Sequence, residues 1–283
     1  MSKNASSGSD DNRKPDNPQE TLKEDNFYYS GFLSAEMSCS VIKATNQNPK
    51  GHYYYAVDFT VSNADKNLLQ NINKAVMNGG GVISPIKGAF NLKARGKNRV
   101  RVIFEFLDKY PIIAGDLAKN RVALLKKALD YLEIHRGHHS HHAKTLMMDD
   151  IRGKLQKIKA TGVALKSFRK ERASKNAVGH FLAGVLDGDG SFGFKKSAYR
   201  KQPFVLVAMK DRKIVELFQR FVQYGNVRKR KDGMYHCEIN HRDVLQKICA
   251  LFLTTYPLRH ARQSERMRKL QRILNDYTRS RSI

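Results

Sequence analysis

Two acidic residues, each closing one of two similar segments, have the clearest capacity for chemistry in this chain. Glu36 ends YSGFLSAE and Asp189 ends LAGVLDGD, and neither segment contains a basic residue. Two carboxylates brought together without a basic partner repel each other unless a cation lies between them. Mg²⁺ takes one or two carboxylates together with phosphate and water oxygens. The pair therefore predicts a metal site with Glu36 and Asp189 as catalytic residues, suited to metal-assisted attack on a phosphodiester.

Two other interpretations of these acids compete with the metal site. In the first, the carboxylates only lie at the seam between two packed segments. The second is a calcium loop, because Asp187, Asp189 and Gly190 are partly similar to an EF-hand. That similarity fails, because the glycine should lie three residues beyond the second aspartate and a glutamate should close the loop.

A helix is expected to position each acid in its last turn. The apolar spacing from Phe181 onward is helical, and Asp189-Gly190 predicts a helix end with a left-handed glycine cap. An acid in that position opposes the helix dipole, at a cost of roughly 0.3 to 1 kcal/mol. Glycines allow close backbone approach. We expect the two helices to pack through the glycines Gly31, Gly184 and Gly188.

An internal duplication supplies the second helix. A constant separation of 153 residues aligns the two acidic segments, and further on the separation becomes 146. The matching pairs are Gly31 with Gly184, Glu36 with Asp189, Asp65 with Asp211, and Tyr110-Pro111 with Tyr256-Pro257. Each copy is predicted to contain a motif helix, two strands, a helix, two strands and two helices. Hairpins covered by a helical layer indicate two α+β units.

The duplication also decides local ambiguities. In the first copy we expect strands at Ser38 to Thr45 and Tyr53 to Ser62, followed by a helix from Asp65 to Met77. The segment Arg99 to Phe106 alternates like a strand. Its counterpart, Asp243 to Leu253, has helical spacing, so both are predicted to be helices.

Four regions follow from composition and from the repeat. Residues 1–26 form a polar tail predicted to be disordered, 27–132 the first repeat, 133–177 a linker rich in His and Lys, and 178–283 the second repeat. The tail lacks the apolar core of a secretory signal and is too acidic for a transit peptide. The histidines of HRGHHSHH (135–142) permit a zinc site, but a solvated linker is the preferred interpretation. Helix is expected at the start of Ile151 to Lys170.

The charge of the chain indicates a polyanionic partner. A formal net charge of +26 on 283 residues favours nucleic acid, because lysine and arginine displace counterions from phosphates. No apolar run is long enough to span a membrane, so no membrane partner is expected. The three cysteines show no paired spacing, which argues against a zinc framework and for a reducing compartment.

The two acidic segments resemble the paired signature of the LAGLIDADG homing endonucleases. LAGVLDGDG at residues 182–190 is a near match, and YSGFLSAEM at residues 29–37 is a degenerate one. The resemblance implies a pseudo-dimeric monomer of two αββαββα repeats, packed through the motif helices, with saddle-shaped antiparallel sheets over the DNA major groove. It also implies Mg²⁺-dependent, site-specific double-strand cleavage by Glu36 and Asp189, and an organellar location, mitochondrion or chloroplast.

Departures from the family pattern support an alternative function. Met37 replaces the glycine after the first acid, and Ser34 replaces the earlier acid. The family often carries a basic residue after Tyr-Pro that aids catalysis, which Arg262 would supply in the second copy, but Asp116 stands at that place in the first. The strand FVLVAM is apolar on both faces. A catalytically silent derivative that binds structured organellar RNA, either ribosomal RNA as a ribosome component or intron RNA as a maturase, is therefore the alternative.

Cations recur at the predicted strand ends of both copies, and we expect them to contact phosphates. They are Lys87, Lys93 and Arg95 in the first copy, and Lys195, Lys196, Arg200, Lys201, Arg228, Lys229, Arg230 and Lys231 in the second.

Overall fold

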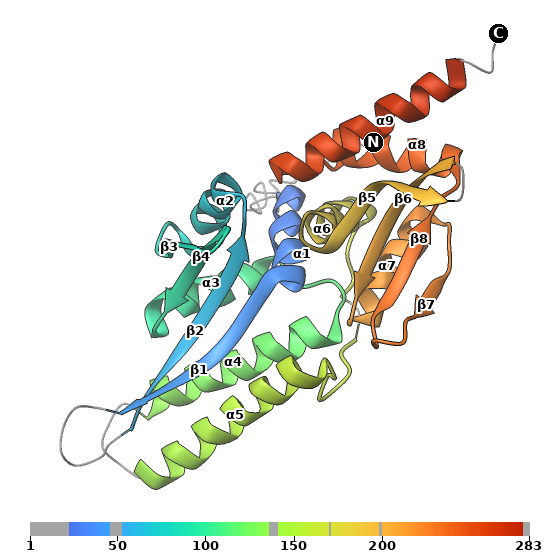
Figure 1. The fold of residues 1–283 in the computed structure, drawn as a ribbon. Coiled ribbons are helices and arrows are strands. Elements are labelled where there is room, and N and C mark those ends of the chain that lie inside the picture. The colour runs from blue at the N-terminus through green and yellow to red at the C-terminus, as the bar shows by residue number, and fades with distance from the viewer. Residues whose placement is uncertain (1–22, 46–52, 136–140, 170, 198–199, 280–283) are drawn as a thin grey trace, which may run out of the picture.

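The protein consists of two halves of the same topology (Figure 1). The computed structural model describes residues 23–45, 53–135, 141–169, 171–197 and 200–279. The first half contains η1 (Glu24–Asn26), α1 (Phe27–Glu36), β1 (Met37–Thr45), β2 (Tyr53–Asn63), α2 (Lys66–Met77), β3 (Val82–Ile86), β4 (Ala89–Arg95), α3 (Lys97–Lys109) and α4 (Asp116–Ile134).

The second half repeats this order after an intervening helix, α5 (His141–Thr161). Its elements are α6 (Lys175–Asp189), β5 (Gly190–Ser197), β6 (Arg200–Met209), α7 (Arg212–Val222), β7 (Val227–Lys229), β8 (Tyr235–Ile239), α8 (Arg242–Ala250), the π-helical turn η2 (Leu251–Thr255) and α9 (Ala261–Arg279). The predicted order of elements is confirmed, including helix α3 where the local pattern alternates like a strand.

Each half has one four-stranded antiparallel sheet. The strand orders are β1-β2-β4-β3 and β5-β6-β8-β7, so the two sheets share one topology. Helices α2 and α3 pack on one face of the first sheet, and α7 and α8 pack on the equivalent face of the second. Among the described elements, no helix packs on the opposite face of either sheet. Motif helices α1 and α6 lie together at the centre of the molecule, between the sheets (Figure 1).

Two matching aspartates fasten each half to the other. The carboxylate of Asp65 accepts a hydrogen bond from the backbone N–H of Leu68 in its own half at 3.1 Å. It accepts another from the N–H of Ala261, at the start of α9, at 3.0 Å. Its counterpart Asp211 receives the N–H of Leu117 at the start of α4 at 2.8 Å. A carboxylate at a helix N-terminus satisfies a free N–H and matches the helix dipole.

The region predicted as a solvated linker contains the long helix α5. Its buried side chains Met148, Ile151, Leu155 and Ile158 form one apolar stripe, which packs on α4 and on β1. Helix α5 begins at His141, ten residues before Ile151, and its buried stripe starts at Met148. Most of the histidine run, and residues 1–22 of the predicted tail, lie outside the described residues. Residues 24–26 of the predicted tail form η1, which leads directly into α1.

Candidate active site

The motif helices approach as closely as backbones allow, at glycines. A Cβ added to Gly31 would lie 1.9 Å from the carbonyl oxygen of Phe181, and one added to Gly184 would lie 2.0 Å from that of Tyr28. Neither position has room for a side chain. Further along the pair, a Cβ at Gly188 would lie 2.6 Å from the Cβ of Ala35 and 3.2 Å from the Cγ of Glu36. The glycines thus bring the ends of both helices, and the acids there, into proximity.

The two acids influence each other electrostatically. Burial and then the charge of Asp189 raise the pKa of Glu36 to about 7. Burial raises the pKa of Asp189 to about 6, although the nearby Arg121 lowers it. The Asp189 residue is nevertheless exposed by its accessible surface, and it lines a surface hollow of about 220 Å³ together with Arg121 and Lys210. Mutual repulsion of this kind is what a divalent cation between the two carboxylates would relieve.

Two carboxylates suit a magnesium ion that keeps water ligands, and not a metal ion that is enclosed entirely by protein ligands. Among the described residues, no cluster of three or more His, Cys, Asp or Glu side chains has the geometry to hold a metal. Mg²⁺ usually keeps several waters and binds through one or two carboxylates and substrate phosphates. Glu36 and Asp189 fit such a set.

Both motif helices end in extended backbone, which corrects the expected left-handed cap. Gly190 has φ −75° and ψ 141°, and Met37 has φ −72° and ψ 142°. Any residue adopts these angles. Met37 therefore meets no backbone strain where the signature has glycine.

Asp187 is structural and does not join the acid pair. Its Oδ2 accepts hydrogen bonds from the hydroxyl of Tyr28 at 2.6 Å and from the backbone N–H groups of Arg259 at 2.6 Å and His260 at 2.9 Å. Burial raises the pKa of its carboxyl to about 6. In the first half, Ser34 occupies the matching position and donates to the Gly31 carbonyl at 2.6 Å. Phe181, which matches Tyr28, has no hydroxyl group. The pair that would correspond to the Tyr28–Asp187 hydrogen bond, Phe181 and Ser34, therefore lacks both the donor hydroxyl and the acceptor carboxylate.

The two residues at the post-Tyr-Pro position have different surroundings. Asp116 forms an ion pair with Lys213 of the second half at 2.9 Å and accepts from the N–H of Phe168 at 2.8 Å. Its role is to hold the segment before α6 in place. Arg262 is exposed in the first turn of α9. Burial lowers the pKa of the neighbouring His260 imidazole, and the charge of Arg262 also lowers it.

Arg121 is the cation that the geometry places beside the acids. It projects from α4, donates to the Met37 carbonyl oxygen at 3.2 Å and influences Asp189. The duplication does not predict this role, because its counterpart is Met267, which is fully buried. In the sequence, the only signal for this role of Arg121 is that it is one of the first basic residues after Tyr110-Pro111.

On the first sheet, the open face is polar. Lys93 pairs in register with Thr60, and Arg95 pairs with Asp58, to which it also forms an ion pair at 3.0 Å. Lys87 lies exposed at the β3–β4 turn. The two strand cations and the turn lysine therefore lie on or beside one open surface.

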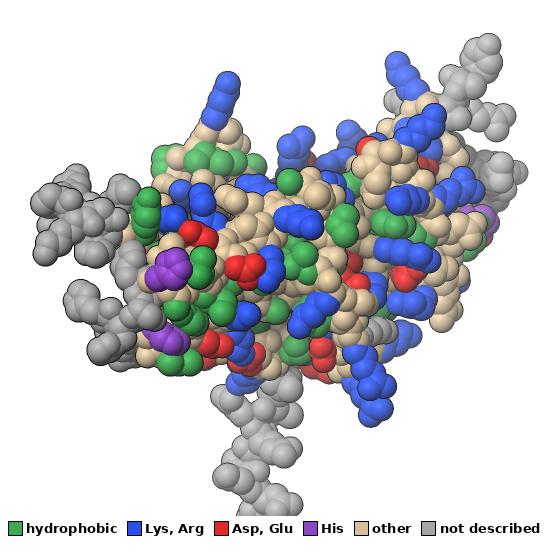
Figure 2. All heavy atoms as spheres, turned by 90° about the horizontal axis from the view of Figure 1, so that it is seen from below, with side chains coloured by type: hydrophobic (Ala, Val, Ile, Leu, Met, Phe, Trp, Pro, Cys, Tyr) green, Lys and Arg blue, Asp and Glu red, His purple; other side chains and the backbone are tan. Residues whose placement is uncertain are grey.

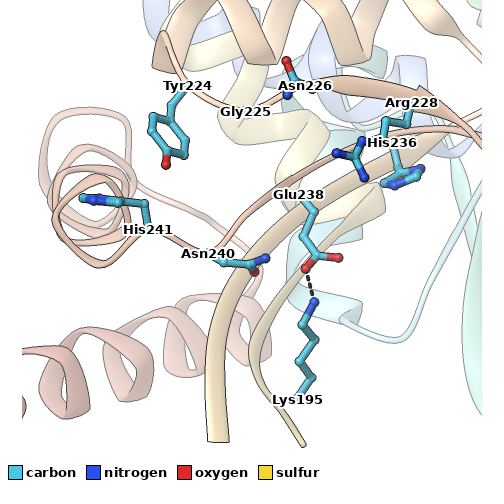
Figure 3. A pocket seen from close by; sticks show the side chains of 9 residues that line it. All are labelled: Lys195, Tyr224, Gly225, Asn226, Arg228, His236, Glu238, Asn240 and His241. Carbon is cyan, nitrogen blue, oxygen red and sulfur yellow. Dashed lines mark hydrogen bonds and ion pairs between the residues drawn. The ribbon is translucent and has the colours of Figure 1, made fainter. Parts of the chain in front are cut away.

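The second sheet carries a polar pocket on its open face. Its volume is about 460 Å³, and Figure 3 shows its lining residues. Lys195 of β5 and Glu238 of β8 form an ion pair across it, and Arg228 and His236 lie at the far end. The central strand β6 adds half-buried Phe204 and Leu206, so this face is more apolar than the first.

The other predicted cations are dispersed. Lys196 and Lys231 are exposed, Lys229 lies 5.7 Å from the ring of Tyr235, and Arg230 pairs with Asp232 at 3.0 Å. Arg200 and Lys201 begin β6, with side chains outside the described residues. Seen from below, Lys and Arg side chains are spread over the whole visible face, among hydrophobic and uncharged surface (Figure 2).

Comparisons with known proteins agree with this architecture. Residues 182–274 match the family model described as LAGLIDADG endonuclease. A search of curated proteins finds no similar sequence. Within the described residues, no helix is long and apolar enough to cross a membrane.

Three solved structures share the fold over nearly the whole chain. They are the LAGLIDADG homing endonuclease I-GzeII with its DNA target (18% identity, TM-score 0.73, covering 91% of each chain), I-SmaMI on uncleaved DNA with calcium ions (21%, 0.74, covering 90% and 92%), and the LAGLIDADG meganuclease I-CpaMI on uncleaved DNA (16%, 0.74, covering 90% and 92%). The fold and the family resemblance predicted from the two motifs are confirmed.

Proposed function

We propose that this chain is a site-specific DNA endonuclease that cuts both strands. It has the LAGLIDADG homing endonuclease fold, and its second half matches the family model. The observation that carries this proposal is the adjacency of Glu36 and Asp189, one from each half, at the ends of helices that pack through glycine. One acid per half suits one strand per half of a duplex. The DNA-bound state of the similar structures supports duplex DNA as the partner.

Each residue has a separate role in this proposal. Glu36 and Asp189 would hold Mg²⁺, which when bound would supply Lewis-acid stabilisation of the charge on the phosphate and on the attacking and leaving oxygens. Arg121 balances the charge of Asp189 from the first half. Arg262, exposed at the start of α9, would assist as an accessory cation. The open faces of the sheets supply Lys93, Arg228 and their neighbours to the phosphates.

Cleavage of a plasmid library with random inserts tests the proposal. Purified protein in Mg²⁺ is expected to linearise a subset of plasmids that share one insert sequence. Asp189→Asn and Glu36→Gln should each abolish linear product but retain binding to the selected duplex, because they remove metal ligands without removing basic residues. Asp150→Asn, on the outer part of α5, is the matched control and should cut normally. Cleavage that survives in both acid variants would show that these acids do not hold the metal.

Binding of structured RNA by a silent derivative is a second candidate. It is supported by the commitment of Asp116 to an ion pair and by the half-buried Phe204 and Leu206 on the second open face, which suit base-edge reading poorly. Crosslinking in native extract, followed by sequencing of the bound nucleic acid, separates the two. Recovery of ribosomal or intron RNA, together with no cleavage in the library, would favour this candidate over the nuclease.

A further inference from the structure

Helix α5 covers a groove in the first half. The groove runs between β1 and α4, and α5 packs on both of these elements. Leu155 of α5 lines the hollow that remains there together with Met37, Cys39 and Arg121. Asp149 of α5 adds a polar anchor, accepting from Lys43 at 2.7 Å and from the hydroxyl of Tyr55 at 3.0 Å. An apolar stripe and one acidic anchor are therefore what this groove binds.

The duplication places a matching groove in the second half, between β5 and α9. It is a hollow of about 300 Å³ lined by Phe192, Gly193, Phe194, Arg266, Lys269 and Leu270. Phe192 and Phe194 match Cys39 and Val41 of the covered groove. Figure 1 shows α5 beside α4, whereas α9 has no described helix on the corresponding side. Among the described residues, this groove is open.

Basic residues surround the open groove. Lys196 matches Lys43, which in the first half pairs with the acid of α5, and Lys196 is exposed. Lys269 is exposed at the rim, and Arg268 and Arg272 extend the positive surface along α9. An occupant therefore needs acidic flanks as well as an apolar stripe.

We propose that the groove between β5 and α9 binds an acidic amphipathic helix of a partner protein. The helix would lie as α5 lies in the first half, with apolar side chains against Phe194 and Leu270 and an acid facing Lys196. A protein helix is favoured over nucleic acid because the floor is apolar. In addition, the guanidinium of Arg266 is already engaged with the Phe192 carbonyl oxygen at 2.8 Å. Helix-in-groove recognition uses apolar anchors three and four residues apart, which is the spacing of the buried stripe of α5.

A defined peptide tests the proposal without knowledge of the natural partner. The probe is the α5 sequence, residues 141–161, with its four lysines replaced by glutamate and a fluorescent label. The full chain should bind this peptide in an anisotropy titration, and more tightly than a scrambled peptide of equal composition. Lys269→Glu and Lys196→Glu should each weaken binding by about tenfold, because each reverses a charge at the rim. The matched control is Lys127→Glu, an exposed site on α4.

Three outcomes would overturn the proposal. Equal binding of the scrambled peptide, or an equal loss in the Lys127→Glu variant, would indicate attraction by overall charge alone. A short RNA or DNA duplex that protects Lys269 from acetylation, where the peptide does not, would assign this surface to nucleic acid. None of these measurements depends on cleavage, so failure of the proposed nuclease function would leave the result readable.

Discussion

At the scale of single residues, the two acids couple the stability of the fold to pH. The folded-state pKa of Glu36 is about 7, well above its unfolded value, so the folded protein binds more protons between these values. Ionisation of Glu36 therefore lowers the free energy of unfolding as the pH rises from about 4.5 to about 7. A bound divalent cation would reverse this loss, since it favours the ionised form.

Glu36→Gln is expected to stabilise the metal-free protein at pH 8. The gain should be about 1 to 2 kcal/mol after allowance for the partial exposure of the site, and it should shrink toward pH 5. Urea unfolding in EDTA at both pH values measures it. Glu105→Gln, at an exposed site on α3, is the control and should change neither value. A destabilised Glu36→Gln protein at pH 8 would contradict the repulsion between the acids.

At the scale of elements, the contact between α1 and α6 depends on the absence of two side chains. A Cβ at Gly184 would lie 2.0 Å from the carbonyl oxygen of Tyr28 and 2.5 Å from the amide nitrogen of Phe32. Both neighbours are backbone atoms, which cannot turn aside as a flexible side chain does. The helices would have to separate, and the acids at their ends would separate with them.

Gly184→Ala should therefore destabilise the protein by about 2 to 4 kcal/mol, despite the higher helix propensity of alanine. Gly153→Ala is the matched control, because a Cβ added to Gly153 inside α5 would meet no atom within 4 Å outside its own helix backbone. That variant should gain about 0.5 to 1 kcal/mol. Thermal unfolding of the two variants beside the parent protein is the measurement. Similar melting temperatures for both variants would mean that the helices do not pack this closely.

Element positions were predictable from the sequence wherever the two copies could be compared. Helix α3 is the clearest case, since its counterpart in the second copy outweighed its strand-like alternation. Helix α5 lies outside the duplication, and its polar, histidine-rich beginning concealed the apolar stripe that starts at Met148. A feature present in only one copy had no counterpart to reveal it.

The site was predictable as a pair of helix ends and less so in its supporting contacts. Glu36 and Asp189 follow from the repeat, whereas the approach of Arg121 to Asp189 depends on how α4 packs across the halves. The meaning of Ser34 also required geometry. The hydrogen bonds that Asp187 accepts from Tyr28, Arg259 and His260 show that the earlier acid of the motif is structural.

At the scale of the whole molecule, the charge of +26 raises the question of which surface meets nucleic acid. Each phosphate contact that a cation makes contributes close to one unit to the slope of log affinity against log salt for duplex DNA. If DNA lies across the open faces, Lys93→Gln and Arg228→Gln should each weaken binding of a duplex and reduce that slope by about 0.9. Arg268→Gln and Arg272→Gln, on the outer face of α9, should leave the slope unchanged. Filter-binding titrations across a salt series measure all four variants. Loss at the α9 positions, with none at Lys93 and Arg228, would place the nucleic acid away from the open faces of the sheets, as a folded RNA held around the second half would require.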